Sequence, residues 1–584
     1  MTLKANLTYN ERKDKVIGFA TDGRKTRPDY ADHAQVFMVR GLIKNYKQPV
    51  SYTFSAGTTS GPELSVQLKE VIKELQRAGL IVIATVCDQG TNNRQAIKLL
   101  IQETRGIFIK SGREPVENMF LVNDQEVIPL FDPPHLIKCI RNNLLTKNLT
   151  YVASDKQLRT AKWQHVELLL KENPGYKGIR LMPKLTDNHV ILNKISKMKV
   201  KYATQIFSQT VASNMGYLAD KGILPEECKE TADILLFFDQ LFDSLNGSYT
   251  KLKQHGKPLL GPARPNSSHN NVWNKAKIEL RNMKFTNIVT GKTEKVPTLE
   301  NWVWTLDGVQ ILLNKLKNDY GVTSVWMRHL NQDPIENFFG AIRSHGCRNT
   351  NPTAERFESA YTSLLINNIS SVHAPGANCE KDYCEVLYTL IIDDCQATVT
   401  SEVESIPTVQ VTDLNEKKKD PRVLGAVQFV SGYFVRSARK KIFKNCQQCT
   451  KDMVASQENE YIKRREYAGK RWLVSPSESL LSCISAMQDI TNEILKRNLY
   501  YENMKEFIKT IILLHIEFDF LNCSRHKDKV IEFVINLSCR FFINNYCKDI
   551  NKILKGRRDS NDDEDVFQIK AKKYFHKCFK RRNK

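Results

Sequence analysis

Ile81–Asp88, with the sequence IVIATVCD, is the stretch that decides the fold class of this 584-residue chain. Seven uncharged, mostly apolar residues are followed by a single aspartate. A continuous apolar run of this length is typical of a strand that is buried on both faces of a sheet. The polar residues QGTNN that come next predict a break in the chain after the strand.

Strand and helix signals alternate on both sides of this stretch. Two runs rich in Val, Phe and Tyr, 33–42 and 48–57, predict neighbouring strands. Apolar residues at helical spacing predict helices at 61–80 and 94–104. Residues 126–145 predict a strand that leads straight into a helix, whose first two residues are prolines. The order indicates an α/β fold for the first part of the chain, 1–145.

The pattern changes after residue 145. Helical periodicity dominates 146–325 and strand signals are scarce, so an all-α insertion is predicted there. The α/β pattern returns at 326–375. A polar linker, 376–425, then precedes a helical and basic C-terminal region, 426–584.

Composition restricts the classes of function. The chain has 87 Lys and Arg against 64 Asp and Glu, a formal net charge of +23, which favours a polyanionic partner such as nucleic acid. No apolar run approaches the ~20 residues of a membrane helix, and the first residues do not form a secretory signal. Its 14 cysteines show no disulfide-framework rhythm, which is typical of a reducing, intracellular compartment.

Asp88 is the first candidate for a functional site. It ends the apolar strand and is followed by a polar, flexible segment. Ligands of α/β sheets bind at the carboxyl ends of strands, so this carboxylate is a candidate metal ligand. An aspartate that forms a turn or caps a helix is the alternative.

Glu336 raises the same question. Residues 333–336, DPIE, fit the positions N-cap to N3 of a helix, which makes a capping box with Asp in place of Ser or Thr. Helical geometry puts the apolar residues that surround Glu336, Phe338 and Phe339 among them, on a face away from this carboxylate. Spacing alone leaves a cap and a metal ligand equally open.

Two further motifs have weaker signals. Asp132 and His135 form a D-x-x-H pair that can bind a metal, although a capping aspartate and a structural histidine are commoner. Cys446 and Cys449 form a C-x-x-C without a second half at zinc-finger spacing, so no zinc site is predicted there.

Three long motifs, in this order, resemble the P element transposase family, which includes the transposase-derived THAP-domain proteins of animals. They are TVCDQGTNNRQAI (85–97), FDPPHLIKCIRNNLL (131–145) and QDPIENFFGAIRSHGCRNTNPTAERFESAY (332–361). The resemblance implies a ribonuclease H-like core split by a guanine-nucleotide-binding insertion. It also implies cut-and-paste DNA transposition by a DDE triad of carboxylates that holds two Mg²⁺ ions.

The resemblance also assigns individual residues. It makes Asp88 the second acid of the triad and Glu336 the third, with Asp132 and His135 as supports of the site. GTP is expected as a positioning cofactor. The residues expected to meet the nucleotide and its metal are Lys184, Lys199, Val200, Asp243 and Asp333. Implied partners are transposon-end and target DNA, with a possible homo-oligomer, no membrane and a nuclear location.

The start of the chain departs from the family pattern. The family has D-E-M at the end of its first core strand, and Met1 matches that methionine. The first acid is therefore expected two positions before the chain begins, and the first strand, the THAP zinc finger and a coiled coil are expected to be missing. Asp22 is a weak substitute because DGRK predicts a turn, and Asp14 lies in a charged run that predicts a solvated turn.

These observations predict an α/β ribonuclease H-like core without its first strand, split by an all-α insertion and followed by a helical C-terminal region. The predicted function is that of an incomplete P element-like DNA transposase. The alternative is a catalytically inactive, transposase-derived protein that binds DNA or GTP.

Overall fold

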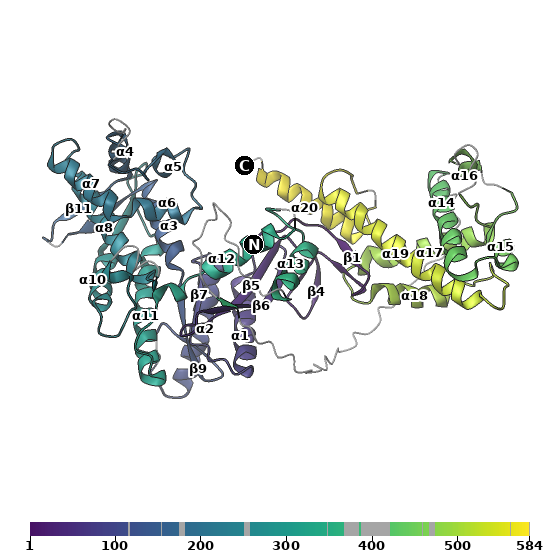
Figure 1. Cartoon of the computed structure of the whole chain (residues 1–584), viewed down its shortest axis with the longest axis horizontal. Coiled ribbons are helices and arrows are strands. Elements are labelled where there is room, and N and C mark those ends of the chain that lie inside the picture. The colour runs from purple at the N-terminus through teal and green to yellow at the C-terminus, as the bar shows by residue number, and fades with distance from the viewer. Residues whose placement is uncertain are drawn as a thin grey trace.

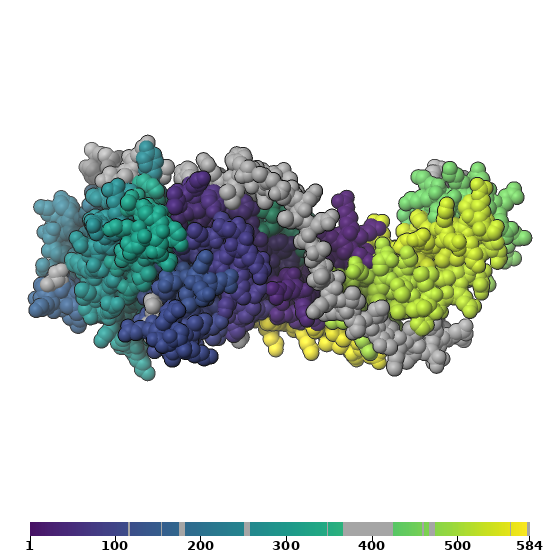
Figure 2. Space-filling view, turned by 90° about the horizontal axis from the view of Figure 1, so that it is seen from below, coloured from purple at the N-terminus to yellow at the C-terminus, as the bar shows by residue number. Residues whose placement is uncertain are grey.

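The computed structural model describes most of the chain. The residues outside its description are 115–116, 154, 174–180, 250–256, 347–348, 367–384, 387–420, 458–459, 466–472, 561 and 583–584. Figure 1 shows an elongated molecule with the insertion at one end, a core in the middle and the C-terminal helices at the other end. In Figure 2 the N-terminal residues, in purple, lie between these two ends. No helix among the described residues is long and apolar enough to cross a bilayer.

The first sheet of the core centres on β6 (Tyr46–Ser55). β5 (His33–Arg40) pairs antiparallel with β6 along its whole length, as the sequence predicts. The sheet is completed by β3 (Phe19–Thr21), β4 (Thr26–Tyr30) and β14 (Glu385–Val386), beside a separate hairpin of β1 (Thr8–Asn10) and β2 (Lys15–Ile17). Helices α12 (Asp333–Ser344) and α13 (Ala354–Ile366) bury their apolar faces against it.

The second sheet of the core has the order β7-β9-β8. β7 (Ala84–Cys87) runs parallel to β9 (Gln125–Phe131), and β8 (Phe120–Val122) is antiparallel to β9. Helices α1 (Gly61–Arg77) and α2 (Thr91–Lys110) cover it with an apolar cluster. The strands and helices predicted around Ile81–Asp88 are therefore confirmed.

The prediction of an all-α insertion is wrong, because this part contains a four-stranded antiparallel sheet. Its strands are β10 (Lys147–Val152), β11 (Leu158–Ala161), β12 (Lys284–Asn287) and β13 (Thr293–Glu294). Leu149 and Tyr151 alternate with more exposed neighbours in β10, which is a strand period. The strands are too short, and too widely separated along the chain, to stand out from the helices. Those helices are α4 (Trp163–Lys171), α5 (Asp187–Val190), α6 (Val200–Ile206), α7 (Gln209–Asp220), α8 (Cys228–Leu245), α10 (Ser268–Asn282) and α11 (Pro297–Tyr320).

The insertion and the core share one hydrophobic cluster. Helix α11 packs directly on β9, where the indole of Trp304 donates a hydrogen bond to the carbonyl of Pro129 at 3.0 Å. Gly308 permits this close contact, since a Cβ there would lie 2.6 Å from a methyl carbon of Leu130. Helix α3 (Pro133–Leu144), at the end of β9, contributes its buried face to the same cluster. The packing therefore crosses the predicted boundaries at 145 and 325.

The C-terminal helices pack with the first 30 residues of the chain rather than alone. The side-chain amide of Asn551 bonds the backbone of Leu7 twice, with both distances 2.7 Å. The turn predicted at Asp14 is present, but the Asp14 side chain is partly buried rather than solvated. Its carboxylate accepts hydrogen bonds from the backbone N–H groups of Lys505 and Glu506 at the start of α18, a tertiary contact that local sequence does not encode.

The helices of this region begin earlier than residue 426. They are α14 (Pro421–Ala438), α15 (Gln447–Met453), α16 (Glu460–Arg465), α17 (Glu478–Asn498), α18 (Met504–His515), α19 (Lys527–Leu554) and α20 (Val566–Arg582), with a π-helical segment at Arg439–Phe443. The predicted linker, 376–425, lies largely outside the described residues, apart from β14 and the start of α14.

Candidate active site

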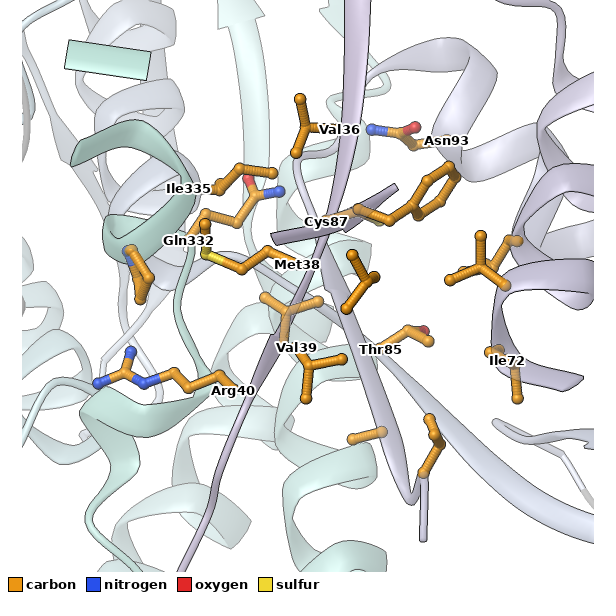
Figure 3. Close-up of a pocket in the computed structure, with 18 of the residues that line it drawn as sticks. Val36, Met38, Val39, Arg40, Ile72, Thr85, Cys87, Asn93, Gln332 and Ile335 are labelled. Carbon is orange, nitrogen blue, oxygen red and sulfur yellow. The ribbon is translucent and has the colours of Figure 1, made fainter. Parts of the chain in front are cut away.

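An elongated cavity separates the two sheets of the core, and we call it the interstrand cavity. Its volume is about 1180 Å³, and its walls are β5, β7, helix α1 and the start of α12. Figure 3 shows Val36 and Met38 of β5 beside Thr85 and Cys87 of β7 in its lining. Among the named strands of the described residues, β5 pairs only with β6 and β7 only with β9. One edge of each strand therefore faces the cavity without a strand partner.

The prediction that Ile81–Asp88 is buried on both faces is wrong, because one side of this strand faces the cavity. All four residues of β7 are only partly buried, and Ile81 just before them is 58% exposed. The reason is tertiary, since no described strand lies against the β5-facing edge of β7. An apolar strand is thus left open along one side.

Residues 1–3 run beside β5, and Met1 lines the interstrand cavity. Thr2 forms an antiparallel bridge with His33, and Met1 exchanges two backbone hydrogen bonds of 2.8 Å with Ala34. Burial and the nearby Arg343 lower the pKa of the Met1 amino group to about 6. If this antiparallel register continued beyond Met1, the second preceding position would lie opposite Val36, inside the cavity.

The start of helix α12 differs from the predicted capping box. The N-cap is Gln332 rather than Asp333, and the Gln332 side chain makes no capping hydrogen bond. Asp333 is buried, and its carboxylate accepts hydrogen bonds of 2.9 Å from Arg328 and Asn331. Asp333 is held in this buried ion pair and is the first residue of the helix rather than its N-cap. Glu336 is therefore the fourth helical residue rather than N3, and it is not part of a cap.

Glu336 instead faces the interstrand cavity. Its Oε1 lies 2.9 Å from Nε2 of His135, and no described residue hydrogen-bonds its Oε2. Phe338 and Ile342 are buried in the cluster against the first sheet, as helical geometry predicts, whereas Phe339 is only partly buried and lines the cavity. Although burial raises the pKa of Glu336, the hydrogen bond and charge of His135 lower it below its usual range. The hydrogen bond to Glu336 and the charge of Asp132 raise the pKa of His135 against the effect of burial.

Asp132 forms hydrogen bonds at the starts of both helices, α3 and α12, that carry His135 and Glu336. It is 1% exposed, and its Oδ2 caps helix α3 by accepting the backbone N–H of His135 at 3.0 Å. Its Oδ1 accepts the backbone N–H of Gln332 at 2.8 Å, which fixes the start of α12. Burial raises the pKa of this carboxyl. Asp132 is therefore placed to position His135 and Glu336 rather than to face the cavity.

Asp88 directly follows β7 and lines the same cavity. Its Oδ1 accepts hydrogen bonds from the backbone of Gly90 at 2.8 Å and from the side chain of Asn93 at 2.7 Å. Asp88 therefore does form a turn, but no described residue hydrogen-bonds its Oδ2. Asp88, His135 and Glu336 line one cavity although they come from three distant segments of the chain. Two carboxylates with an oxygen available suit a hard cation such as Mg²⁺.

Asp22 does not reach this site. Its carboxylate accepts the backbone N–H groups of Arg24 and Lys25, both at 2.9 Å, and lies 3.7 Å from Arg27. These contacts confirm the predicted turn. Asp22 is also absent from the lining of the interstrand cavity.

The residues expected to bind a nucleotide lie on four separate elements. Lys184 is exposed in a loop, and Lys199 lies just before α6, with its Nζ 5.2 Å from the ring centre of Tyr202. Val200, the first residue of α6, is half-buried. The two carboxylates are already engaged, Asp333 in the buried pair described above and Asp243 with the Nζ of Lys257 at 2.7 Å.

Lys257 and Asp239, which accompany Asp243, were not predicted from the sequence. Lys257 also contacts Asp239 on α8, at 3.0 Å. Burial and the neighbouring Asp243 raise the pKa of Asp239. The spacing of Asp239 and Asp243, one helical turn apart in the otherwise uncharged stretch 234–245, is the signal that could have identified the pair.

Comparisons with known proteins agree with this arrangement. Residues 1–101 match the TNP-like RNase H N-terminal domain, residues 134–258 the TNP-like GTP-binding insertion domain, and residues 329–362 the TNP-like RNase H C-terminal domain. The three matches occur in the order of the core, the insertion and the return to the core.

Two curated proteins are similar over much of the chain. The Transposable element P transposase of Drosophila melanogaster is 25% identical over 420 residues, which are 70% of this chain and 52% of that protein. The DNA transposase THAP9 of Homo sapiens is 26% identical over 382 residues, which are 62% of this chain and 40% of that protein. The chain thus spans about half the length of these relatives or less.

One solved structure shows the same fold. It is described as the Drosophila P element transposase strand transfer complex, and it superposes with a TM-score of 0.51 at 24% sequence identity. The match covers 63% of this chain and 76% of that chain. The ribonuclease H-like fold with an insertion is therefore shared.

Proposed function

We propose that this chain is a P element-like DNA transposase of the DDE type, because its core and insertion match the TNP-like domains and its sequence is similar to two transposases. The observation that carries the proposal is that Asp88, His135 and Glu336 all line the interstrand cavity. We further propose GTP as the cofactor of the insertion, transposon-end and target DNA as substrates, a nuclear location and a homo-oligomeric assembly. We also propose that the chain is divided into five parts, 1–145, 146–325, 326–375, 376–425 and 426–584.

The residues of the cavity have distinct roles in this proposal. Asp88 and Glu336 supply the carboxylate oxygens Oδ2 and Oε2. His135 holds Glu336 through its other oxygen, and Asp132 fixes both helices that carry these two side chains. Two Mg²⁺ ions bound there would activate the attacking oxygen and stabilise the leaving oxygen of a phosphodiester. The net charge of +23 supplies contacts to the DNA backbone.

We also propose that the site needs a third carboxylate, delivered by an extended strand in the interstrand cavity. Such a strand would continue the pairing of Met1–Leu3 with β5 and would cover the open edge of β7. Its residue opposite Val36 would lie near Cys87, at the end of β7 that precedes Asp88. Without that carboxylate the second candidate function applies, a protein that binds DNA or GTP without cutting DNA.

The chain of residues 1–584 is expected to bind DNA without cleaving it. Binding should fall by roughly 10³-fold or more between 50 and 200 mM salt if six or more phosphates are contacted, because neutralised phosphates release counterions. Gel-shift titrations at several salt concentrations measure this, beside a cleavage assay on transposon-end DNA with Mg²⁺ or Mn²⁺. Cleavage that disappears in Glu336→Ala would contradict the need for a third carboxylate from outside the chain.

The insertion is expected to bind GTP without a P-loop. Lys199→Ala should weaken binding by roughly 10–100-fold, since a hydrogen bond to a charged group contributes about 1.5–3 kcal/mol. Isothermal titration with GTP and Mg²⁺, compared with ATP, measures the affinity and the base preference. Lys194→Ala is the matched control, because Lys194 is an exposed lysine that pairs with Asp187. Equal affinity for ATP, or no change in Lys199→Ala, would refute the assignment.

A further inference from the structure

Four metal-ligating side chains meet in the C-terminal region, away from the site described above. They are Cys446, Cys449, Cys523 and His526, and one ligand atom from each lies within 4.8 Å of every other. The spacing of Cys446 and Cys449 alone predicts no zinc site, because no second half lies at zinc-finger spacing. The second half exists as Cys-x-x-His, beginning at Cys523, but helices α16, α17 and α18 separate it from the first. The prediction of no zinc site is therefore corrected by the fold.

The distances among these atoms fit a tetrahedral metal site. Zinc bonds of about 2.3 Å to sulfur and about 2.0 Å to nitrogen place two sulfur ligands about 3.8 Å apart, and sulfur and nitrogen about 3.5 Å apart. The Sγ atoms of Cys446 and Cys523 are 3.9 Å apart. Nδ1 of His526 lies 3.5 Å from the Sγ atoms of both Cys449 and Cys523. A disulfide, with its sulfur atoms about 2.05 Å apart, does not fit these distances.

The surroundings hold the ligands in place. Cys446 is the N-cap of helix α15 and Cys449 lies in its first turn, while His526 is the N-cap of α19. Cys449 is fully buried and Cys523 is 8% exposed. The carboxylate of Asp452 accepts the backbone N–H of Asn522 at 2.9 Å, a second link between the same two segments.

We propose that Cys446, Cys449, Cys523 and His526 bind one structural zinc ion. Four protein ligands complete the tetrahedral coordination that is typical of structural zinc sites, which leaves no position for a substrate. The ion would link helix α15 to the start of α19, two elements that are far apart in the sequence. It would thereby fix the helices of the C-terminal region that pack against residues 5–30. The proposal is independent of the transposase assignment, because the site lies outside the three matched regions.

The test measures zinc in the full-length chain purified from zinc-supplemented cells, by mass spectrometry of the metal. About one zinc per chain is expected, with loss of the metal in Cys449→Ser and Cys523→Ser. Cys578→Ser, on helix α20 outside the cluster, is the matched control and should keep its zinc. His526→Cys should also keep one ion, since a fourth thiolate is an equally common zinc ligand.

A second measurement covers the case in which the serine variants do not fold. Cobalt exchanged into the wild-type chain should give thiolate-to-cobalt charge transfer and the intense visible bands of a tetrahedral site, and His526→Cys should shift these bands. Three results would overturn the proposal. They are a folded wild-type chain without stoichiometric zinc, zinc retained by Cys449→Ser, and a disulfide between Cys446 and Cys523 in thiol titration.

Discussion

Cleavage of transposon-end DNA is expected to rise by about 10³-fold or more when the chain is extended in front of Met1 by a β-strand that ends in Asp-Glu. The antiparallel pairing of Thr2 with His33 sets the register of the added strand, and its Asp falls opposite Val36. A third carboxylate there completes the ligands that hold both metal ions. Metal stabilisation of the transition-state charge contributes several kcal/mol, and each 1.36 kcal/mol is a factor of ten in rate.

The matched control is the same extension with Asn in place of the Asp. This variant should fill the interstrand cavity equally well, so both extensions should raise the melting temperature over that of the unextended chain. Only the Asp extension should cleave DNA, and Glu336→Ala within it should abolish the cleavage. If neither extension changes stability, the cavity does not accept a strand. If both are stabilised and neither cleaves, the catalytic assignment of Asp88 and Glu336 fails.

Replacing Asp132 with alanine is expected to lower the free energy of unfolding by about 2–4 kcal/mol. The loss of a helix cap costs about 0.5–2 kcal/mol. The backbone N–H of Gln332, left without its partner, adds about 1–3 kcal/mol. A urea titration followed by tryptophan fluorescence measures the change.

Asp132→Asn is the control for this prediction, because its amide oxygen still accepts one of the two backbone N–H groups. It also lacks the charge that burial disfavours, so the loss of stability should be smaller than in the alanine variant. Equal urea midpoints for the wild-type and alanine proteins would show that Asp132 does not fix helices α3 and α12.

The sequence determined the elements whose signals are local and strong. The apolar run that ends in Asp88, the strands 33–42 and 48–57, and the amphipathic helices around them are present as predicted. The resemblance to the P element transposase family was also accessible, since three long motifs in order carry it. The separation of Phe338 and Glu336 onto opposite faces of a helix followed from helical geometry alone.

Tertiary structure decided what depends on partners distant in the chain. Glu336 is not part of a cap because Asp333 pairs with Arg328, and it faces the cavity because His135 holds it there. The short strands of the insertion exist through pairing across more than a hundred residues, which no local period reports.

The two largest differences have the same physical cause. The partial exposure of β7 depends on the open edge beside it, and the metal site depends on helices that bring Cys523 and His526 to Cys446 and Cys449. Burial and ligand geometry are properties of what surrounds a residue in space. Sequence spacing reports that environment only when the neighbours lie within the same helix or strand.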